Sequence, residues 1–185
     1  MDRERAEHAV REILEALGTQ HLNEEVLAHT PRRVAAAYEE FFEHIDRDPA
    51  DVLEVVYQEK YEEMIAMRGI TFHSICEHHL LPFVGTADIV YLPQGGRIVG
   101  ASKLARAVDI AASRPQLQER LTQQIADAFI QKLEPLGVLV RLQATHLCMT
   151  LRGVKKPGAQ MVTSAIRGSF YRDAAQRAEA LALIS

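Results

Sequence analysis

The sequence switches between helical and strand periodicity in a fixed order, and this order constrains the fold more than any other feature. Apolar spacing predicts helices at residues 3–17, 31–45, 102–114, 115–137 and 172–184, and strands within 69–93 and at 138–153 and 159–170. Two pairs of strands separated by a pair of helices indicate an α+β domain. We therefore expect antiparallel hairpins with helices on one face and a helical extension at the N-terminus.

The predicted helix ends depend on proline, glycine and hydroxyl residues. Thr30 is the expected N-cap of the second helix, with Pro31 at its first position, and Ser102 is the expected N-cap of the third. Pro115 is expected to open the fourth helix and Gly137 to close it.

Length and charge restrict the class of protein. The 185 residues suit one structural unit, divided into a helical region at 1–66 and a mixed region at 67–185, with residues 46–64 open between helix and strand. No apolar run reaches the ~20 residues of a membrane span, and the charged N-terminus does not resemble a secretory signal, so we expect a soluble cytoplasmic protein. The net charge of −4 provides no overall attraction to nucleic acid or to a membrane.

The stretch CEHH places Cys76, His78 and His79 close together, and the other cysteine, Cys148, follows 72 positions later (148 − 76). Cys76 and His79 can face one centre from a tight turn, and Cys148 can reach it from the predicted strand. Two thiolates and one imidazole suit zinc, and three protein ligands leave one position open. A reducing compartment argues against a disulfide between the two cysteines.

A fourth protein ligand would make the site structural instead of catalytic. The candidates are His73, Glu77, His78 and His146. His146 has the parity of Cys148, so on one strand face the two would lie about 7 Å apart, which suits a proton donor as well as a ligand. His78 directly precedes another candidate and is more suited to facing a substrate. Catalytic zinc, structural zinc and no metal all remain open on spacing alone.

Five stretches, CEHHLLPFVG, VGASKLAR, RPQLQERLTQQI, ATHLCMTLRG and VTSAIRGSF, resemble in order and spacing the motifs of GTP cyclohydrolase I. The resemblance runs from about Thr30 to the C-terminus. It implies the tunnelling fold, with residues 67–185 as the catalytic region, in a toroidal homodecamer with active sites at subunit interfaces. It also implies conversion of GTP to 7,8-dihydroneopterin triphosphate and formate, the first step of folate or tetrahydrobiopterin biosynthesis. Regulation by a partner protein stays open.

The resemblance assigns Cys76, His79 and Cys148 as zinc ligands with an open position. Zinc would activate water for attack at C8 of the guanine ring, which then opens and loses formate. His146 matches the acid/base histidine of the family, and His78 matches a second active-site histidine that assists proton transfer. The ribose would then open, isomerise in an Amadori fashion and close the pterin ring.

The remaining matches concern substrate binding. Glu119 matches a carboxylate that accepts from guanine N1–H and the 2-amino group, a pairing that adenine cannot make. Gln118 matches the neighbouring glutamine, and Ser102 matches a serine near the ribose. The positions that match triphosphate ligands are Lys103, Arg106, Arg152 and, from a neighbouring subunit, Arg33.

Two residues depart from the family pattern. Ala101 stands where a larger aliphatic residue is common, and Arg167 occupies a position that is often aliphatic. The effect of these departures on substrate affinity and on regulation stays open. Two further hypotheses remain, and Ala101 motivates the first of them. One is a tunnelling-fold enzyme that acts on another purine or pterin. The other is a non-enzymatic oligomer whose zinc is structural and whose pocket only binds a pterin or nucleotide.

Overall fold

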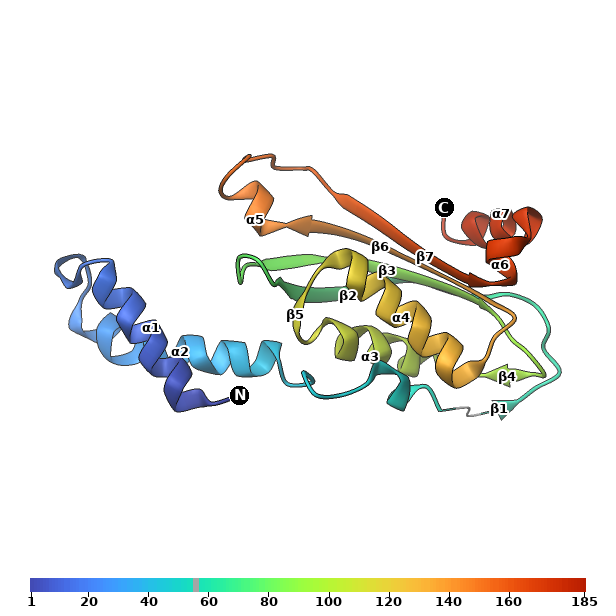
Figure 1. The fold of residues 1–185 in the computed structure, drawn as a ribbon, viewed down its shortest axis with the longest axis horizontal. Helices are drawn as coiled ribbons and strands as arrows, with labels where there is room; N and C mark the ends of the chain where they lie inside the picture. The colour runs from blue at the N-terminus through green and yellow to red at the C-terminus, as the bar shows by residue number, and fades with distance from the viewer. Residues whose placement is uncertain (55–56) are drawn as a thin grey trace. The chain divides into compact units, whose positions relative to one another are not determined.

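The computed structural model describes residues 1–54 and 57–185 and divides into two compact units, Met1–Glu43 and His44–Ser185 (Figure 1). The division between residues 66 and 67 stays a prediction. Among the described residues, no helix is both long and apolar enough to cross a membrane.

The N-terminal unit consists of two helices, α1 (Arg3–Ala16) and α2 (Glu24–Phe41), joined through the short turn η1 (Thr19–His21). The predicted start of α2 at Thr30 is wrong, because the helix begins after Asn23, whose side chain accepts a hydrogen bond from Val26 N at 2.8 Å. The first turn of α2 is acidic, which favours a start there because carboxylates stabilise the positive end of the helix dipole. Pro31 is therefore an internal residue of α2.

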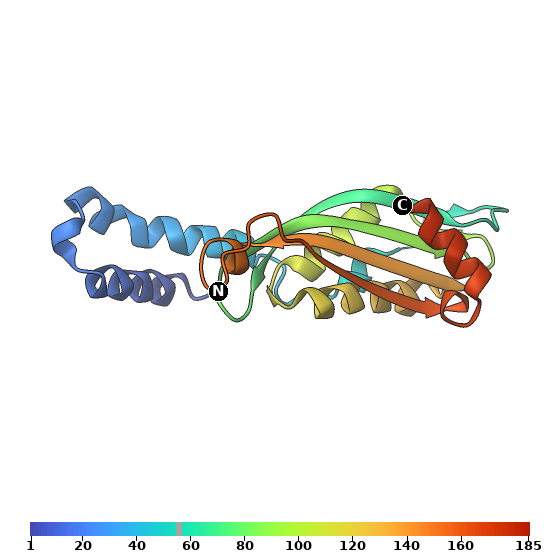
Figure 2. The same cartoon turned by 90° about the horizontal axis from the view of Figure 1, so that it is seen from above.

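The unit His44–Ser185 is built on a five-stranded sheet in the order β5-β2-β3-β6-β7. The strands are β2 (Ile65–Cys76), β3 (Pro82–Leu92), β5 (Pro115–Gln116), β6 (Gly137–His146) and β7 (Met161–Gly168). The four long strands pair antiparallel and lie side by side in Figure 2, and only the short β5 pairs parallel, with the end of β2. A two-stranded ribbon is formed by β1 (Tyr57–Gln58) and β4 (Arg97–Ile98).

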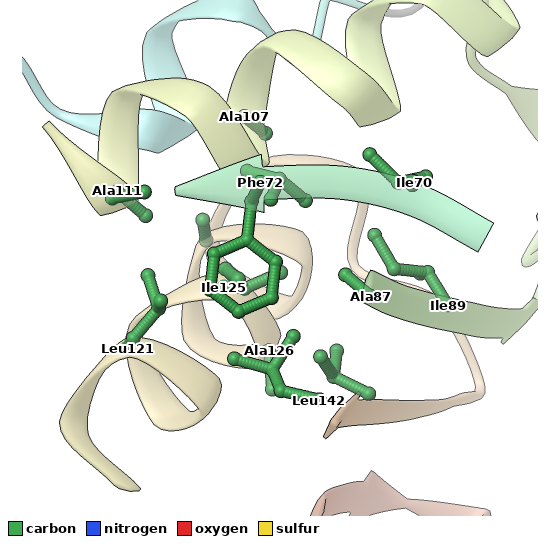
Figure 3. Packing of buried hydrophobic residues seen from close by; sticks show 14 of the residues in the cluster. Ile70, Phe72, Ala87, Ile89, Ala107, Ala111, Leu121, Ile125, Ala126 and Leu142 are labelled. Atoms are coloured by element: carbon green, nitrogen blue, oxygen red, sulfur yellow. The ribbon is translucent and has the colours of Figure 1, made fainter. Parts of the chain in front are cut away.

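The helices of this unit lie on both faces of the sheet. They are α3 (Ala101–Ala112), α4 (Gln118–Leu133), the short α5 (Leu147–Thr150) and α6 (Ser169–Arg172), α7 (Ala174–Leu183) and the turn η2 (Pro49–Val52). Strand residues of one parity pack under α3 and α4, with Phe72 at the centre (Figure 3). Residues of the other parity, such as Val90 and Leu139, form a second cluster with α7. The predicted α+β arrangement, an antiparallel sheet with a helical pair on one face, is confirmed.

Three predicted helix ends are wrong. α3 begins one residue before Ser102, at Ala101, and its N-cap Gly100 makes no side-chain bond. Pro115 does not open α4; it pairs with Ile75 as part of β5, since the edge of β2 offers the chain a strand partner. The helix ends at Leu133, before a left-handed Glu134, because the following residues from Gly137 onward form β6.

The predicted strand 138–153 is also too long. β6 ends at His146, and the chain turns into α5, where Leu151 N donates to Leu147 O at 3.0 Å. Cys148 therefore lies on a helical turn, and the expectation that it shares a strand face with His146 is wrong. The turn redirects Cys148 toward the β2–β3 connection, so the two residues can serve different parts of one site.

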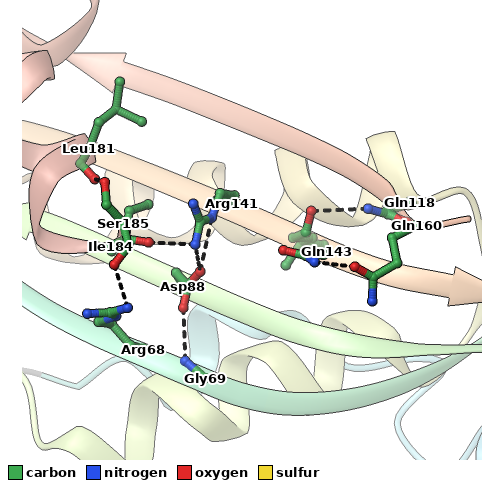
Figure 4. Close-up of polar contacts among 11 residues, drawn as sticks. Arg68, Gly69, Asp88, Gln118, Arg141, Gln143, Gln160, Leu181, Ile184 and Ser185 are labelled. Atoms are coloured by element: carbon green, nitrogen blue, oxygen red, sulfur yellow. Dashed lines mark hydrogen bonds and ion pairs between the residues drawn. The ribbon is translucent and has the colours of Figure 1, made fainter. Parts of the chain in front are cut away.

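A polar network fastens the C-terminal residues to the sheet (Figure 4). Asp88 on β3 is directly opposite Arg141 on β6, and its carboxylate accepts from both Arg141 Nε and Nη2, at 3.1 and 2.8 Å. Arg141 Nη2 also donates to Ile184 O, and Asp88 accepts from Gly69 N at a bulge of β2. These bonds hold β2, β3, β6 and the end of α7 in one arrangement.

Candidate metal centre and active site

Cys76, His79 and Cys148 bring one ligand atom each within 4.8 Å of one another. Cys76 Sγ lies 3.7 Å from His79 Nδ1, and both cysteines are free thiols. Two ligands of a tetrahedral zinc ion, one sulfur and one nitrogen, are separated by about 3.6 Å when the metal bonds are about 2.3 and 2.1 Å. The donor set and its spacing therefore fit a metal ion.

The turn between β2 and β3 explains how two ligands come from four consecutive residues. Leu80 N and His79 N both donate to Cys76 O, at 2.9 and 3.3 Å, and these bonds form a tight hydrogen-bonded turn. Leu80 takes a left-handed conformation with φ of 52°, and Cys76 N donates to Leu81 O at 2.9 Å. The tight turn directs Cys76 and His79 to one side.

None of the proposed fourth ligands belongs to this cluster. Within residues 1–54 and 57–185, the group that could hold a metal contains only the two cysteines and His79. His73, Glu77, His78 and His146 lie outside it. The arrangement thus offers three protein ligands and agrees with an open coordination position.

The electrostatics of the thiols also favour a cation. Burial raises the pKa of the Cys148 thiol, and the neighbouring Cys76 raises it further, because a second thiolate beside the first would be repelled. The nearby Arg152 guanidinium lowers the pKa of the Cys148 thiol, because its positive charge favours the thiolate. A divalent cation held by Cys76 and Cys148 would offset this repulsion and stabilise both thiolates.

Arg152 contacts His79, the histidine of the three-residue cluster. Its Nη1 atom lies 3.2 Å from His79 Nε2. An arginine can only donate, so this contact requires a lone pair on Nε2. A neutral imidazole that binds a metal through Nδ1 carries its proton on Nε2. The Arg152 contact and a metal bond at Nδ1 would therefore require different tautomers of His79.

His146 lies at the end of β6, directly opposite Phe83 on β3. The two rings stack with centroids 4.5 Å apart and an interplanar angle of 2°. His146 Nε2 is 2.8 Å from Gln118 Oε1 on the first residue of α4. The stack and the hydrogen bond together restrict the imidazole to one orientation.

Gln118 is buried, and its partners determine which way its amide points. Its Nε2 atom lies 3.2 Å from Leu142 O, 3.0 Å from Met161 O and 3.1 Å from Thr163 Oγ1. A reversed amide would place its oxygen against two carbonyl oxygens, so Oε1 faces His146. Oε1 accepts from His146 Nε2–H, and the Nδ1 atom of His146 is left for another partner.

Glu119 follows Gln118 on α4 and is exposed. Burial lowers the pKa of His146, and the Glu119 carboxylate partly offsets this effect by favouring the charged imidazolium. The structure thus brings Gln118, Glu119 and His146 into one group next to the metal cluster, since His146 is two residues before Cys148.

Three predicted substrate residues of the unit His44–Ser185 are not part of this group. Ser102, Lys103 and Arg106 lie on the first half of α3, whereas its last residue, Ala112, accepts from Ser74 Oγ near the end of β2. Ser102 is ten residues before Ala112 (112 − 102), about 15 Å along the helix axis. Arg33 is an exposed residue of α2 in the N-terminal unit.

Lys103 and Arg106 line a pocket of about 500 Å³ instead. Its other lining residues include two further basic groups, His44 and Arg47, as well as the acidic Asp51, Glu54 and Asp109.

Sequence reasoning missed several contacts that shape the site. Phe83 stacks on His146, and Thr163 holds the amide of Gln118. Glu77, one of the candidate fourth ligands, pairs with Arg120 of α4 at 2.5 Å. The alternation of β3 could have suggested that Phe83 faces inward, but no local pattern reveals a pair 43 positions apart.

Arg167 and Ala101, the departures from the family pattern, lie outside the metal cluster. Arg167 on β7 donates to Asp127 of α4 at 2.8 Å, and Ala101 is the exposed first residue of α3.

Comparison with known proteins agrees with the geometry. The sequence profile of the family GTP cyclohydrolase I matches residues 6–185. A protein named GTP cyclohydrolase 1 from Clostridioides difficile is 54% identical over 186 residues, covering 100% of this chain and 97% of the relative. One of the same name from Bacillus subtilis is 51% identical over 181 residues, covering 98% and 95%. The chain belongs to the GTP cyclohydrolase I family.

Proposed function

We propose that this protein converts GTP to 7,8-dihydroneopterin triphosphate and formate at the site around Cys76, His79 and Cys148. The observation that carries the proposal is the combination of a three-ligand metal cluster with an oriented histidine and a carboxylate beside it. Three ligands leave room for a reacting group, and the pair of His146 and Glu119 offers proton transfer and recognition of a base. The product belongs to the entry step of folate or tetrahydrobiopterin biosynthesis.

Zinc is the proposed metal, held by Cys76, His79 and Cys148. Two thiolates and an imidazole are typical of zinc, and softer or harder metals prefer other donor sets. Bound zinc supplies Lewis acidity and lowers the pKa of a water molecule for hydrolytic attack at C8 of guanine. The two free thiols also support a reducing location, and we propose the cytoplasm.

His146 is the proposed acid/base group. Because Gln118 accepts from its Nε2–H, the proton that is exchanged with the substrate moves at Nδ1. Stacking on Phe83 keeps the ring in one plane while its charge changes. His78, whose side chain is exposed on the metal-ligand turn, is proposed to assist proton transfer.

Glu119 is proposed to accept from guanine N1–H and the 2-amino group. Replacing Glu119 with glutamine should lower kcat/KM for GTP by about 10²-fold, because an amide presents one donor where the substrate requires two acceptors. The substitution should lower kcat/KM less for inosine triphosphate, which lacks the 2-amino group, than for GTP. The measurement is kcat/KM for GTP, inosine triphosphate and ATP in both proteins. Unchanged preference for GTP in the variant would exclude this role.

The triphosphate is proposed to bind to Lys103, Arg106, Arg152 and Arg33, with Ser102 near the ribose. Arg152 is adjacent to the metal cluster. Ser102, Lys103 and Arg106 lie on the first half of α3, whereas Ala112 at the other end of this helix contacts Ser74 near the end of β2, so these three residues lie apart from the cluster of their own chain. We propose that a second copy contributes the missing cations and that the protein is a homodecamer with its active sites between subunits. Symmetric assemblies of this kind complete sites with residues from neighbouring chains.

The test of this function is incubation of the zinc-loaded protein with GTP, followed by chromatographic detection of formate and of dihydroneopterin triphosphate. We expect both products in equal amounts, and neither after chelation of the metal. Formate without the pterin would show that ring opening occurs without the ribose rearrangement. Retention of zinc with no product would favour a structural metal in a binding protein.

A further inference from the structure

A pair of charged residues outside the proposed reaction connects the metal-ligand turn to helix α4. Glu77 lies between Cys76 and His78, and its Oε2 atom accepts from Arg120 Nη2 at 2.5 Å. Arg120 follows Glu119 in the first turn of α4. The pair therefore joins the residues that hold the metal to the residues that face His146.

The two ends of this connection differ in how firmly they are held. α4 is anchored in the core by Leu121, Ile125 and Phe129, which are fully buried. The turn after Cys76 is exposed at His78, His79 and Leu80. Arg120 is thus a fixed point, and Glu77 is the residue through which the turn is attached to it.

The backbone also attaches the start of the turn to β5. Cys76 pairs with Gln116 of β5, and Glu77 N donates to Gln116 O at 3.0 Å. Within the turn, His79 N and Leu80 N donate to Cys76 O, and the Glu77 side chain adds a link from the turn to α4. The Glu77 carboxylate also faces His78, with Oε1 and Nε2 4.0 Å apart.

We propose that Glu77 and Arg120 form a positioning pair, which aligns the metal-ligand turn with Gln118 and Glu119 and thereby with the substrate base. The proposal rests on the proposed function for its catalytic consequence. An enzyme that attacks one atom of a base held elsewhere needs that alignment to within fractions of an ångström, since small displacements of well-oriented groups cost large factors in rate. Neither residue touches the reacting atoms, so both act through the groups that they hold.

A merely structural role predicts a different result. The side chains of Glu77 and Arg120 are 29% and 40% exposed, and partly exposed ion pairs contribute little to folding stability. Loss of the pair should therefore leave the protein folded and its metal bound. A change in rate without a change in stability separates positioning from folding.

The test uses Glu77→Gln, Arg120→Gln, the double variant and Arg120→Lys in the full-length, zinc-loaded protein. A matched control is Arg167→Gln, which removes another ion pair of α4, with Asp127, away from the metal cluster. We expect each single variant to lower kcat for GTP at least about tenfold with a smaller change in KM, and Arg120→Lys to recover part of the loss. The double variant should be no slower than the single ones, because both remove the same contact. Arg167→Gln should keep the original kcat.

Wild-type kcat for Arg120→Gln, or losses that multiply in the double variant, would overturn the proposal. A fall in thermal stability or zinc content that matches the fall in rate would assign the pair a structural role instead. If the unchanged protein does not turn over GTP, the proposed function fails while positioning is still tested with cobalt in place of zinc. The cobalt absorption bands should then shift in Glu77→Gln and Arg120→Gln and not in Arg167→Gln, and identical bands in all proteins would refute the alignment.

Discussion

Replacing Cys148 with alanine is expected to abolish metal binding and to lower GTP turnover by about 10³-fold or more. The substitution removes one of three ligand atoms, and a two-ligand site retains neither the charge nor the geometry that zinc requires. The reaction then loses the Lewis acid, whose contribution to hydrolysis amounts to several kcal/mol. The measurements are metal content per chain by atomic emission and the rate of formate release.

Met149→Ala is the matched control for this experiment. Met149 is the next residue of the same short helix, and its side chain is exposed. It should bind metal and turn over GTP as the unchanged protein does. If Cys148→Ala still held one zinc per chain at the original affinity, the ligand set derived from the cluster would be incorrect.

Cys148→Ala can also be used to test whether active sites are shared between chains. Lys103→Ala should be inactive through loss of a triphosphate contact while it keeps its metal. If a site takes Cys148 from one chain and Lys103 from another, mixed oligomers of the two variants should regain up to about a quarter of the original activity. No recovery in oligomers verified to be mixed would indicate that each chain supplies its own cations.

Replacing His146 with alanine is expected to leave zinc bound and to lower kcat by about 10²- to 10⁴-fold, the usual contribution of a general acid or base. Zinc should remain because His146 is outside the cluster of ligand atoms. The rate should fall because the Nδ1 atom oriented by Gln118 and Phe83 is lost. Zinc content and formate release, measured on one preparation, distinguish the two effects.

His8→Ala provides a control for the loss of a histidine, since His8 is an exposed residue of α1 paired only loosely with Glu12, at 3.7 Å. It should retain both zinc and turnover. Near-normal product formation by His146→Ala would remove this residue from the mechanism, and loss of zinc along with activity would make it a ligand.

Local sequence patterns were sufficient for the kind of element and for much of the candidate site. Alternation and β-branched residues predicted the strands that became β2, β3, β6 and β7, because these strands bury one set of side chains under α3 and α4. The first and last residues of the helices and strands were harder to predict. Pro115 has the features of a helix start, but it pairs with the edge of β2 as part of β5. This pairing depends on Ile75, a partner 40 positions away (115 − 75), which local patterns do not reveal.

The sequence by itself determined the chemistry of this protein, since the types and spacing of Cys76, His79 and Cys148 define a zinc-like donor set and the motifs around them identify the family. The tertiary structure decided how these groups are used. It excluded His146 from the metal cluster and turned the amide oxygen of Gln118 toward His146. It also attached the turn that contains Glu77 to Arg120 of α4. The physical reason is that donor chemistry belongs to a residue, whereas orientation comes from strand register and helix packing between segments that are distant in the chain.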